Sequence, residues 1–162
     1  MKYAGAGSFQ RNRPLLSFAA GYAGRMADYS FRIATQDDIQ AITDIYNAAV
    51  IRGGSSADTT PRTYAQRKAW VESHHDPYAV FVTTVPATDA GERIIGFSAL
   101  SVFYDRAGYD GVTDLAYYIA PEWQGRGAGT FTLAKLRDEC RNRHLRKACG
   151  IIFADSRGSI AL

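Results

Sequence analysis

Three glycines alternate with other residues in the segment "QGRGAG", residues 124–129, and an arginine stands among them. Because Gly125, Gly127 and Gly129 lack side chains, successive backbone N–H groups can point into one hollow. A helix predicted directly after them adds about half a positive charge at its N-terminus. Such N–H groups and a helix N-terminus together bind phosphate or pyrophosphate. The segment therefore predicts an anion site, with Arg126 at its rim.

The common nucleotide-binding motifs do not match this loop. A Walker loop requires Gly-Lys-Ser/Thr, which is absent here. A dinucleotide fingerprint has its third glycine one position later and lies in an early parallel strand–helix–strand unit. On the glycines alone, a tight turn that serves only packing remains an alternative.

Hydrophobic periodicity predicts the elements that position the loop. Alternation indicates a first strand at 30–34, and Thr35 with two following acids begins a helix whose buried face repeats at helical spacing. The remaining patterns predict a second helix at 63–73, strands at 79–85 and 94–103 joined as a hairpin, a strand at 112–119, a helix at 129–144 and a strand at 147–154. This order predicts an α/β protein with a mixed, mostly antiparallel sheet rather than a doubly wound one.

The charge distribution and the cysteine content argue against nucleic acid, membrane and metal as partners. The net charge is +3, but residues 1–26 hold four cations and no acid, so the remainder is close to −1. We therefore expect no nucleic-acid partner, and no apolar run is long enough for a membrane span. Cys140 and Cys149 form no metal-binding pattern, which predicts two idle thiols in a cytoplasmic protein without a metal.

The basic segment 1–28 is predicted to be a disordered extension of a domain at 29–162. Its short apolar patch, Leu15 to Ala20, faintly resembles a signal peptide, but Ser17 and Gly21 interrupt the pattern. A translation start upstream of Met26 would also explain the segment.

The residues around the glycine loop resemble the acetyl-CoA motif of the GNAT acetyltransferases. The motif core is Gln/Arg-x-x-Gly-x-Gly/Ala, and here it follows the family's strand-Pro-Glu-aromatic approach, Ile119 to Trp123. The stretches "IYNAAV", "TPRTYAQRKAWVESHHDPYAVFV" and "SRGSIAL" are similar to the phosphinothricin acetyltransferase branch. The resemblance spans most of residues 29–162 and implies the GNAT acyl-CoA N-acyltransferase fold, with helices on both faces of the sheet.

The resemblance also implies where acetyl-CoA binds as the co-substrate. Its pyrophosphate would lie on the N–H groups of residues 125–130, and its pantetheine arm would pair like an added strand with the backbone of 117–119, in the gap between the family's splayed fourth and fifth strands. A backbone N–H near Ile119 would meet the thioester carbonyl. The cofactor-binding residues expected in this way are Tyr117, Tyr118, Ile119, Gln124, Gly125, Arg126, Gly127, Ala128, Gly129, Thr130 and Ser156.

Acetyl transfer to an amine requires a base, because the nitrogen must lose a proton before it attacks. The phosphinothricin branch has a glutamate on the fourth strand, seven positions before the proline. Counting back from Pro121 gives Asp114, which keeps the acid with one carbon fewer. We expect Asp114 to be the catalytic base; an ordinary solvent-facing acid on a strand is the alternative.

Several other polar and aromatic residues are weaker candidates. His74 and His75 are expected to be a solvated helix terminus rather than catalytic groups, and His144 a helix C-terminal residue. Tyr104 and Tyr109 either line the acceptor pocket or cover the sheet edge.

Two departures from the branch concern the end of the chain. Ser156 stands where the branch has an asparagine that contacts the cofactor. The family continues with a helix and two strands that carry its general acid, so the sequence predicts a domain that is incomplete at its C-terminus.

The resulting hypothesis is an N-acetyltransferase that moves acetyl from acetyl-CoA to the amino group of a small amino-acid-like acceptor, of the phosphinothricin or methionine-derivative type, by direct attack. The resemblance also implies a homodimer. A catalytically inactive CoA-binding module of the same fold is the main alternative, and a nucleotide-binding domain of another fold is a weaker one.

Overall fold

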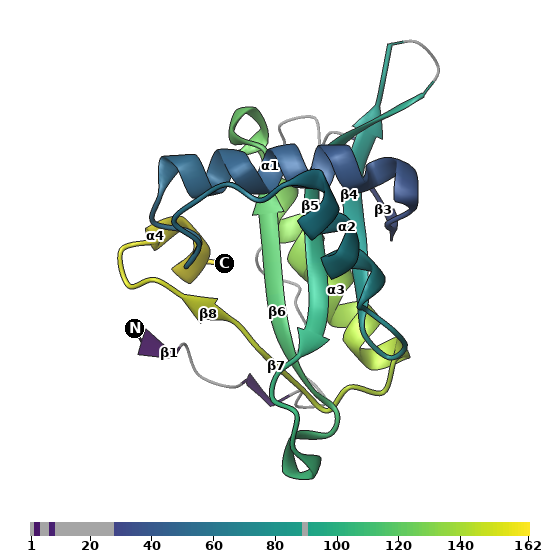
Figure 1. Cartoon of the computed structure of the whole chain (residues 1–162), viewed down its shortest axis with the longest axis vertical. Coiled ribbons are helices and arrows are strands. Elements are labelled where there is room, and N and C mark those ends of the chain that lie inside the picture. Colours follow the sequence, from purple (N-terminus) through teal and green to yellow (C-terminus); the bar gives the residue numbers. More distant parts are fainter. Residues whose placement is uncertain (1, 4–6, 9–27, 89–90) are drawn as a thin grey trace, which may run out of the picture.

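A computed structural model of the protein describes residues 2–3, 7–8, 28–88 and 91–162 (Figure 1). The strands are β1 (Lys2–Tyr3), β2 (Gly7–Ser8), β3 (Ser30–Ile33), β4 (Ala79–Pro86), β5 (Glu92–Val102), β6 (Val112–Ile119), β7 (Lys147–Cys149) and β8 (Ile151–Ile152). The α-helices are α1 (Ile39–Arg52), α2 (Tyr64–Glu72), α3 (Ala128–Asn142) and α4 (Arg157–Ile160). Short 3₁₀ turns cover Gln36–Asp38, Ala107–Tyr109 and Pro121–Trp123.

The main sheet is mixed, as the sequence predicts. Its strand order is β2-β7-β6-β5-β4-β3, and β8 pairs with β1 outside it. β3, β4, β5 and β6 form successive antiparallel pairs, whereas β6 and β7 are parallel because the α3 crossover joins them. The two-residue strands β1 and β2 lie in the segment predicted to be disordered, and residues 4–6 and 9–27 lie outside the described part of the chain.

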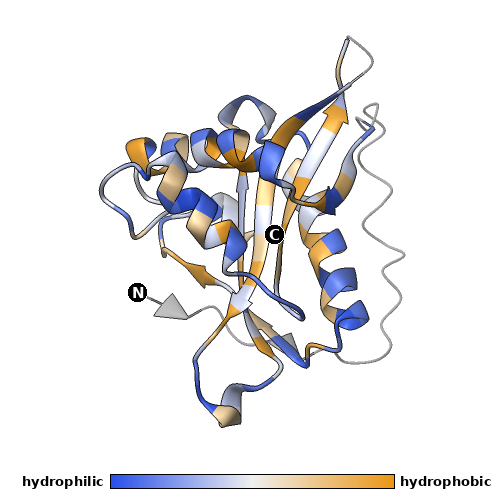
Figure 2. Ribbon diagram, turned by 45° about the vertical axis from the view of Figure 1, so that its right-hand side comes forward, coloured by the Kyte–Doolittle hydropathy of each residue, from blue (hydrophilic) through white to orange (hydrophobic). Residues whose placement is uncertain are grey.

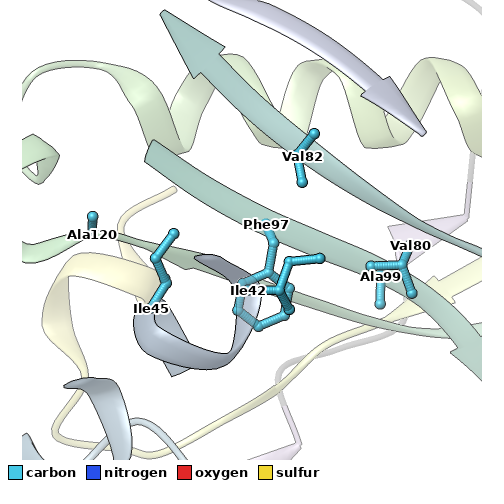
Figure 3. Close-up of a cluster of buried hydrophobic side chains, with 7 residues drawn as sticks. All are labelled: Ile42, Ile45, Val80, Val82, Phe97, Ala99 and Ala120. Carbon is cyan, nitrogen blue, oxygen red and sulfur yellow. The ribbon is translucent and has the colours of Figure 1, made fainter. Parts of the chain in front are cut away.

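Helices cover both faces of this sheet (Figure 1). On one face, α1 contributes Ile42 and Ile45 to a core that the strands complete with Val80, Val82, Phe97 and Ala99 (Figure 3). On the other face, α3 contributes Leu136 and Cys140, which pack on Ala79, Phe81 and Leu100. Neighbouring residues of β4 and β5 thus point to opposite cores. The helices carry both hydrophobic and hydrophilic residues, as expected for elements with one face on a sheet (Figure 2).

The predicted strand at 147–154 is wrong in its length, and the reason bears on function. β7 pairs with β6 only as far as Asp114 opposite Cys149. At Gly150 the chain turns away, and β8 diverges from β6 towards α4 (Figure 1). Continuous hydrophobicity in "KACGIIFA" predicts one strand, but a strand needs a partner along its whole length, and this one leaves its partner halfway.

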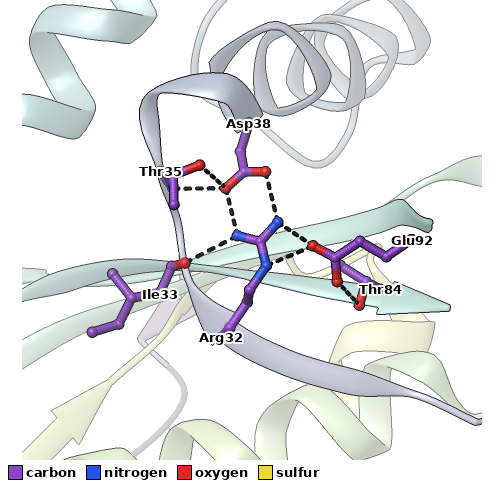
Figure 4. A network of polar contacts seen from close by, with 6 residues as sticks. All are labelled: Arg32, Ile33, Thr35, Asp38, Thr84 and Glu92. Atoms are coloured by element: carbon purple, nitrogen blue, oxygen red, sulfur yellow. Dashed lines mark hydrogen bonds and ion pairs between the residues drawn. The ribbon is translucent and has the colours of Figure 1, made fainter. Parts of the chain in front are cut away.

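A polar network joins β3 to the turn before α1 (Figure 4). The Asp38 side chain is buried and accepts hydrogen bonds from Arg32 Nη1 at 2.6 Å and Nη2 at 2.9 Å. Thr35 donates its N–H to the same carboxylate at 2.6 Å, and Glu92 binds the other side of the Arg32 guanidinium. Burial alone would raise the pKa of Asp38, but the hydrogen bonds from Arg32 and Thr35 outweigh it and hold that pKa below its usual value.

Replacing Asp38 with asparagine should lower the free energy of unfolding by about 2 kcal/mol at pH 7, because the Arg32 guanidinium loses its buried counter-charge while remaining about one-third exposed. Urea denaturation measures this difference. It should shrink as the pH falls below 3.8, because Asp38 of the unfolded chain is protonated there first, and it should be lost once the pH falls through the lower pKa of the folded carboxyl. Asp37→Asn, at the exposed neighbouring position, is the matched control and should leave stability unchanged; equal losses in both variants would contradict the assignment.

Candidate active site

The glycine loop has the backbone that the sequence predicts. Gly125 and Gly127 have φ angles of +71° and +91°, in the region that side chains disfavour. Gly127 is the N-cap of α3. Within the described part of the chain, none of the N–H groups from Gly125 to Thr130 has a hydrogen-bond partner, and the first helical bond runs from Phe131 N–H to the Gly127 carbonyl at 3.0 Å. The loop therefore presents a row of free donors at a helix N-terminus, which suits an anionic ligand.

Side chains and close backbone contacts fix this loop to the end of β6. Gln124 Nε2 donates to the Ile119 carbonyl at 2.9 Å, and Gln124 Oε1 accepts from Arg52 at 3.1 Å. The Tyr29 hydroxyl donates to the Arg126 carbonyl at 2.8 Å. Gln124, predicted as a cofactor contact, thus holds the loop in place through its side chain.

One edge of β6 is open beside the loop. β7 leaves β6 after Asp114, so the backbone of 115–119 has no strand partner on that side in the described structure. Side chains of this stretch alternate: Tyr117 packs with the α3 core, whereas Tyr118 stacks on Phe97 at 5.2 Å between ring centroids. The predicted contact with 117–119 is therefore available to a ligand only through the backbone edge.

The segment after β8 returns to the glycine loop. A Cβ placed on Gly129 would lie 3.1 Å from Leu162 Cδ1 and 3.6 Å from the Tyr117 ring. Ser156 precedes α4, is half-buried and donates to Ser159 Oγ at 3.2 Å. The end of the chain, at Leu162, thus lies against the glycine loop, whereas the contact of Ser156 with the cofactor stays a prediction.

The remaining loop residues differ in what they expose. The Ala128 side chain is buried in a small core with Val85 and Ile95, so only its N–H faces outward. Arg126 and Thr130 are exposed, and the Arg126 guanidinium carbon lies 5.3 Å from the centre of the Trp123 ring. Trp123 packs against two of the cores.

Asp114 lies at the point where β6 and β7 separate. It is half-buried and faces Ser101 of β5 and Cys149 of β7 in register. Burial raises the pKa of its carboxyl, and the Leu115 N–H only partly offsets this effect. A carboxylate with a raised pKa beside an open strand edge suits proton abstraction better than an ordinary solvent-facing acid would.

Sequence reasoning missed a polar cluster under the α1–α2 loop. The Tyr46 hydroxyl donates to Asp58 at 2.6 Å and lies 2.8 Å from Ser56 Oγ, while Arg62 forms an ion pair with Asp58 at 2.5 Å. Arg67 is 6% exposed, and its guanidinium carbon lies 3.9 Å over the Tyr46 ring. The composition of "RGGSSADTTP" indicates only a loop, and the spacing of Arg67 and Trp70 on one helical face is the available signal for the cluster.

The tyrosines of the loop before β6 and the third histidine, His144, are all exposed. Tyr104 and Tyr109 are exposed and contact each other and Phe103, with ring centroids 4.8–5.6 Å apart. The loop that carries them lies at the end of the sheet where β6, the strand of Asp114, begins. Lining the acceptor pocket and covering the sheet edge therefore both stay open as their role. His144 follows α3 with a φ angle of +55° and is exposed.

Comparison with protein families agrees with this geometry. The acetyltransferase (GNAT) family matches residues 21–162. The chain belongs to the GNAT family of acetyltransferases. The predicted mixed sheet, with helices on both faces and a glycine loop between β6 and α3, is thereby confirmed as the fold of this family.

Curated relatives lie in the phosphinothricin and methionine sulfoximine branch. The GNAT chain is 31% identical to an N-acetyltransferase of Streptomyces griseus over 75% of this chain and 64% of the relative, so it spans just under two-thirds of that protein. It is 30% identical to phosphinothricin N-acetyltransferase of Streptomyces coelicolor, over 84% and 79% of the two chains. It is 27% identical to L-methionine sulfoximine/L-methionine sulfone acetyltransferase of Pseudomonas aeruginosa, over 82% and 76%.

A solved structure supplies the link to the co-substrate. The GNAT phosphinothricin acetyltransferase of Sinorhizobium meliloti, solved in complex with acetyl-CoA, superposes with a TM-score of 0.71 and 26% identity over 82% of this chain and 70% of that one.

Across the described residues, no helix is both long and apolar enough to cross a membrane, and no group of three or more His, Cys, Asp or Glu side chains is arranged to hold a metal ion.

Proposed function

We propose that this GNAT protein transfers acetyl from acetyl-CoA to the amino group of a small amino-acid-like acceptor by direct attack. The observation that carries the proposal is the row of free N–H groups from Gly125 to Thr130, set beside the open edge of β6. A diphosphate satisfies such donors, and an extended amide-containing arm satisfies such an edge. Family membership and relatives solved with acetyl-CoA support the same ligand.

The protein's own groups would divide the work along the strand. The N–H groups of the glycine loop hold the diphosphate, with Arg126 at the rim, and the backbone of 117–119 orients the arm beside it. Ser156, at the start of α4, would add a hydroxyl contact to the ligand. Acetyl-CoA, when bound, supplies an activated acetyl thioester. A backbone N–H near Ile119 would stabilise negative charge on the thioester carbonyl oxygen.

Asp114 would act as the base. It accepts a proton from the acceptor's ammonium group, which frees the nitrogen lone pair for attack. Its carboxyl is half-buried at the separation of β6 and β7, where burial keeps its pKa raised. A base with a raised pKa holds the abstracted proton more firmly than an exposed aspartate does.

The acceptor is proposed from the relatives. Phosphinothricin and methionine sulfoximine or sulfone, which the names of two relatives specify, are the first compounds to test. They would enter on the sheet face that carries Asp114 and the polar cluster around Tyr46 and Arg67. We also propose a homodimer, as the resemblance implies, and a cytoplasmic location, since both cysteines are free thiols.

Asp114→Asn should lower kcat/KM for the best acceptor by roughly 100-fold or more, because general-base catalysis is lost. The Kd for acetyl-CoA should stay unchanged, since Asp114 lies outside the glycine loop. Stopped-time assays of released thiol and calorimetry measure the two quantities. In the parent, activity should fall as the pH drops through the raised pKa of Asp114, because the protonated acid cannot accept a proton.

Asp110→Asn, in the exposed loop before β6, is the matched control and should keep full activity. Full activity of Asp114→Asn would remove Asp114 from the mechanism. Binding of acetyl-CoA by the parent without turnover of any amine in the panel would favour the inactive CoA-binding module.

Gly127→Val should weaken coenzyme A binding by roughly tenfold or more, because a β-branched residue does not tolerate a φ of +91° and displaces the loop N–H groups. Calorimetry with soluble, folded protein measures the change. Gly54→Val is the matched control: its φ is +73° and a Cβ there also meets nothing within 4 Å, so the strain is comparable while the residue lies outside the glycine loop. Equal affinities in the parent and Gly127→Val would contradict the assigned loop.

A further inference from the structure

His74 is not a solvated helix end, as the sequence suggests, but a half-buried side chain with both ring nitrogens hydrogen-bonded. It follows α2, its Nδ1 lies 2.8 Å from the Trp70 carbonyl oxygen, and its Nε2 lies 2.8 Å from Ser101 Oγ. The Trp70 ring also contacts the imidazole edge-on at 4.6 Å between centroids. The imidazole is therefore held in one orientation against the sheet.

The two partners decide which nitrogen carries the proton. A backbone carbonyl can only accept a hydrogen bond, so Nδ1 must be the protonated nitrogen of the neutral ring. Burial lowers the pKa of His74, the Trp70 carbonyl partly offsets this, and the neighbouring His75 adds to the lowering, so the ring is neutral near pH 7. Nε2 then has a lone pair, and the Ser101 hydroxyl must donate its single proton to it.

Ser101 is the residue directly opposite Asp114. The two are register partners on β5 and β6 and so share one face of the sheet. Side chains at such positions have Cβ atoms about 4.5–5.5 Å apart, which brings the Ser101 hydroxyl within reach of the carboxylate. No hydrogen bond joins the two side chains in the described structure, in keeping with a hydroxyl proton directed at His74.

We propose that His74 is a positioning residue of the active site: it accepts the Ser101 proton at Nε2 and so prevents that hydroxyl from donating to the Asp114 carboxylate. The proposal rests on the proposed role of Asp114 as the base. In this arrangement the Ser101 hydroxyl donates to His74 Nε2, and His74 Nδ1–H donates to the Trp70 carbonyl. The chain of hydrogen bonds does not include the Asp114 carboxylate.

The consequence is electrostatic. Asp114 is faced by Ser101 from β5 and by Cys149 from β7, and no charged side chain of the described residues contributes to the raised pKa of its carboxyl. If the serine proton turned to the carboxylate, a charge-assisted hydrogen bond would stabilise the ionised form and lower that pKa by about one unit. By accepting the Ser101 proton, His74 thus keeps the pKa of Asp114 raised and the carboxylate a stronger base.

The test is His74→Phe, which fills a similar volume and cannot accept the proton. Carbon-13 NMR of the Asp114 carboxyl, assigned by its loss in Asp114→Asn, should show the Asp114 pKa falling by about one unit. In the plot of kcat/KM against pH, the acid limb should move to a pH lower by the same amount. In the double variant His74→Phe/Ser101→Ala the pKa should return to the parent value, because no hydroxyl is left to donate. A structural role for His74 predicts no such return.

The matched control is His75→Phe, at the exposed neighbouring position, which should leave the Asp114 pKa within a few tenths of a unit of the parent. An unchanged Asp114 pKa in folded His74→Phe would overturn the proposal while leaving the base assignment intact. A shift in the NMR titration without a shift in the activity profile would instead remove Asp114 from the base role.

Nitrogen-15 NMR of the parent provides a test that does not depend on the folding of any variant. The imidazole of His74 should show a protonated Nδ1 and an unprotonated Nε2 at pH 7. A protonated Nε2 would overturn the proposal, since that nitrogen would then donate to Ser101 and leave the hydroxyl proton free for Asp114.

Discussion

The separation of β6 from β7 is the constraint on which the rest of the site depends. Parallel pairing ends where Asp114 meets Cys149, and the chain turns away at Gly150. A sheet edge left open inside a domain is a row of unsatisfied backbone groups, which folding does not favour by itself. Here the edge adjoins the free N–H groups of the glycine loop, so the same ligand can satisfy both.

The two faces of the sheet differ in the side chains that they carry, because side chains alternate along each strand. The face under α3 is a hydrophobic core that fixes the helix whose N-terminus meets the anion. The face under α1 and α2 holds the polar groups: Asp114, Ser101 with His74, and the cluster around Tyr46. Rigid burial on one face thus supports directed hydrogen bonds on the other. The Arg32–Asp38 network stabilises β3, the edge strand on the far side of the main sheet from β7.

Direction, more than proximity, distinguishes the hydrogen bonds around the proposed base. A carbonyl that can only accept fixes the tautomer of His74, and the tautomer fixes which way the serine proton points. Burial raises the pKa of Asp114 only as long as no neighbour donates to it. In the glycine loop, the Gln124 side chain donates to the Ile119 carbonyl and so fixes the loop. The backbone N–H groups of the loop stay unpaired among the described residues.

The sequence by itself determined the elements, the mixed sheet and the glycine loop, because periodicity, capping residues and glycine spacing act over short stretches of chain. The expectation that Asp114 is the base came instead from the resemblance to the phosphinothricin branch. The sequence predicted one strand at 147–154 and solvent around His74, and both were wrong. The first depends on where β6 stops offering a partner, and the second on a serine 27 residues away in sequence. The cluster of Tyr46, Asp58 and Arg67 was likewise not predicted, since a loop and two helices meet there and only Arg67 had a local signal. Only the tertiary structure decides such contacts, because pairing, burial and hydrogen-bond direction arise between segments that the sequence keeps apart.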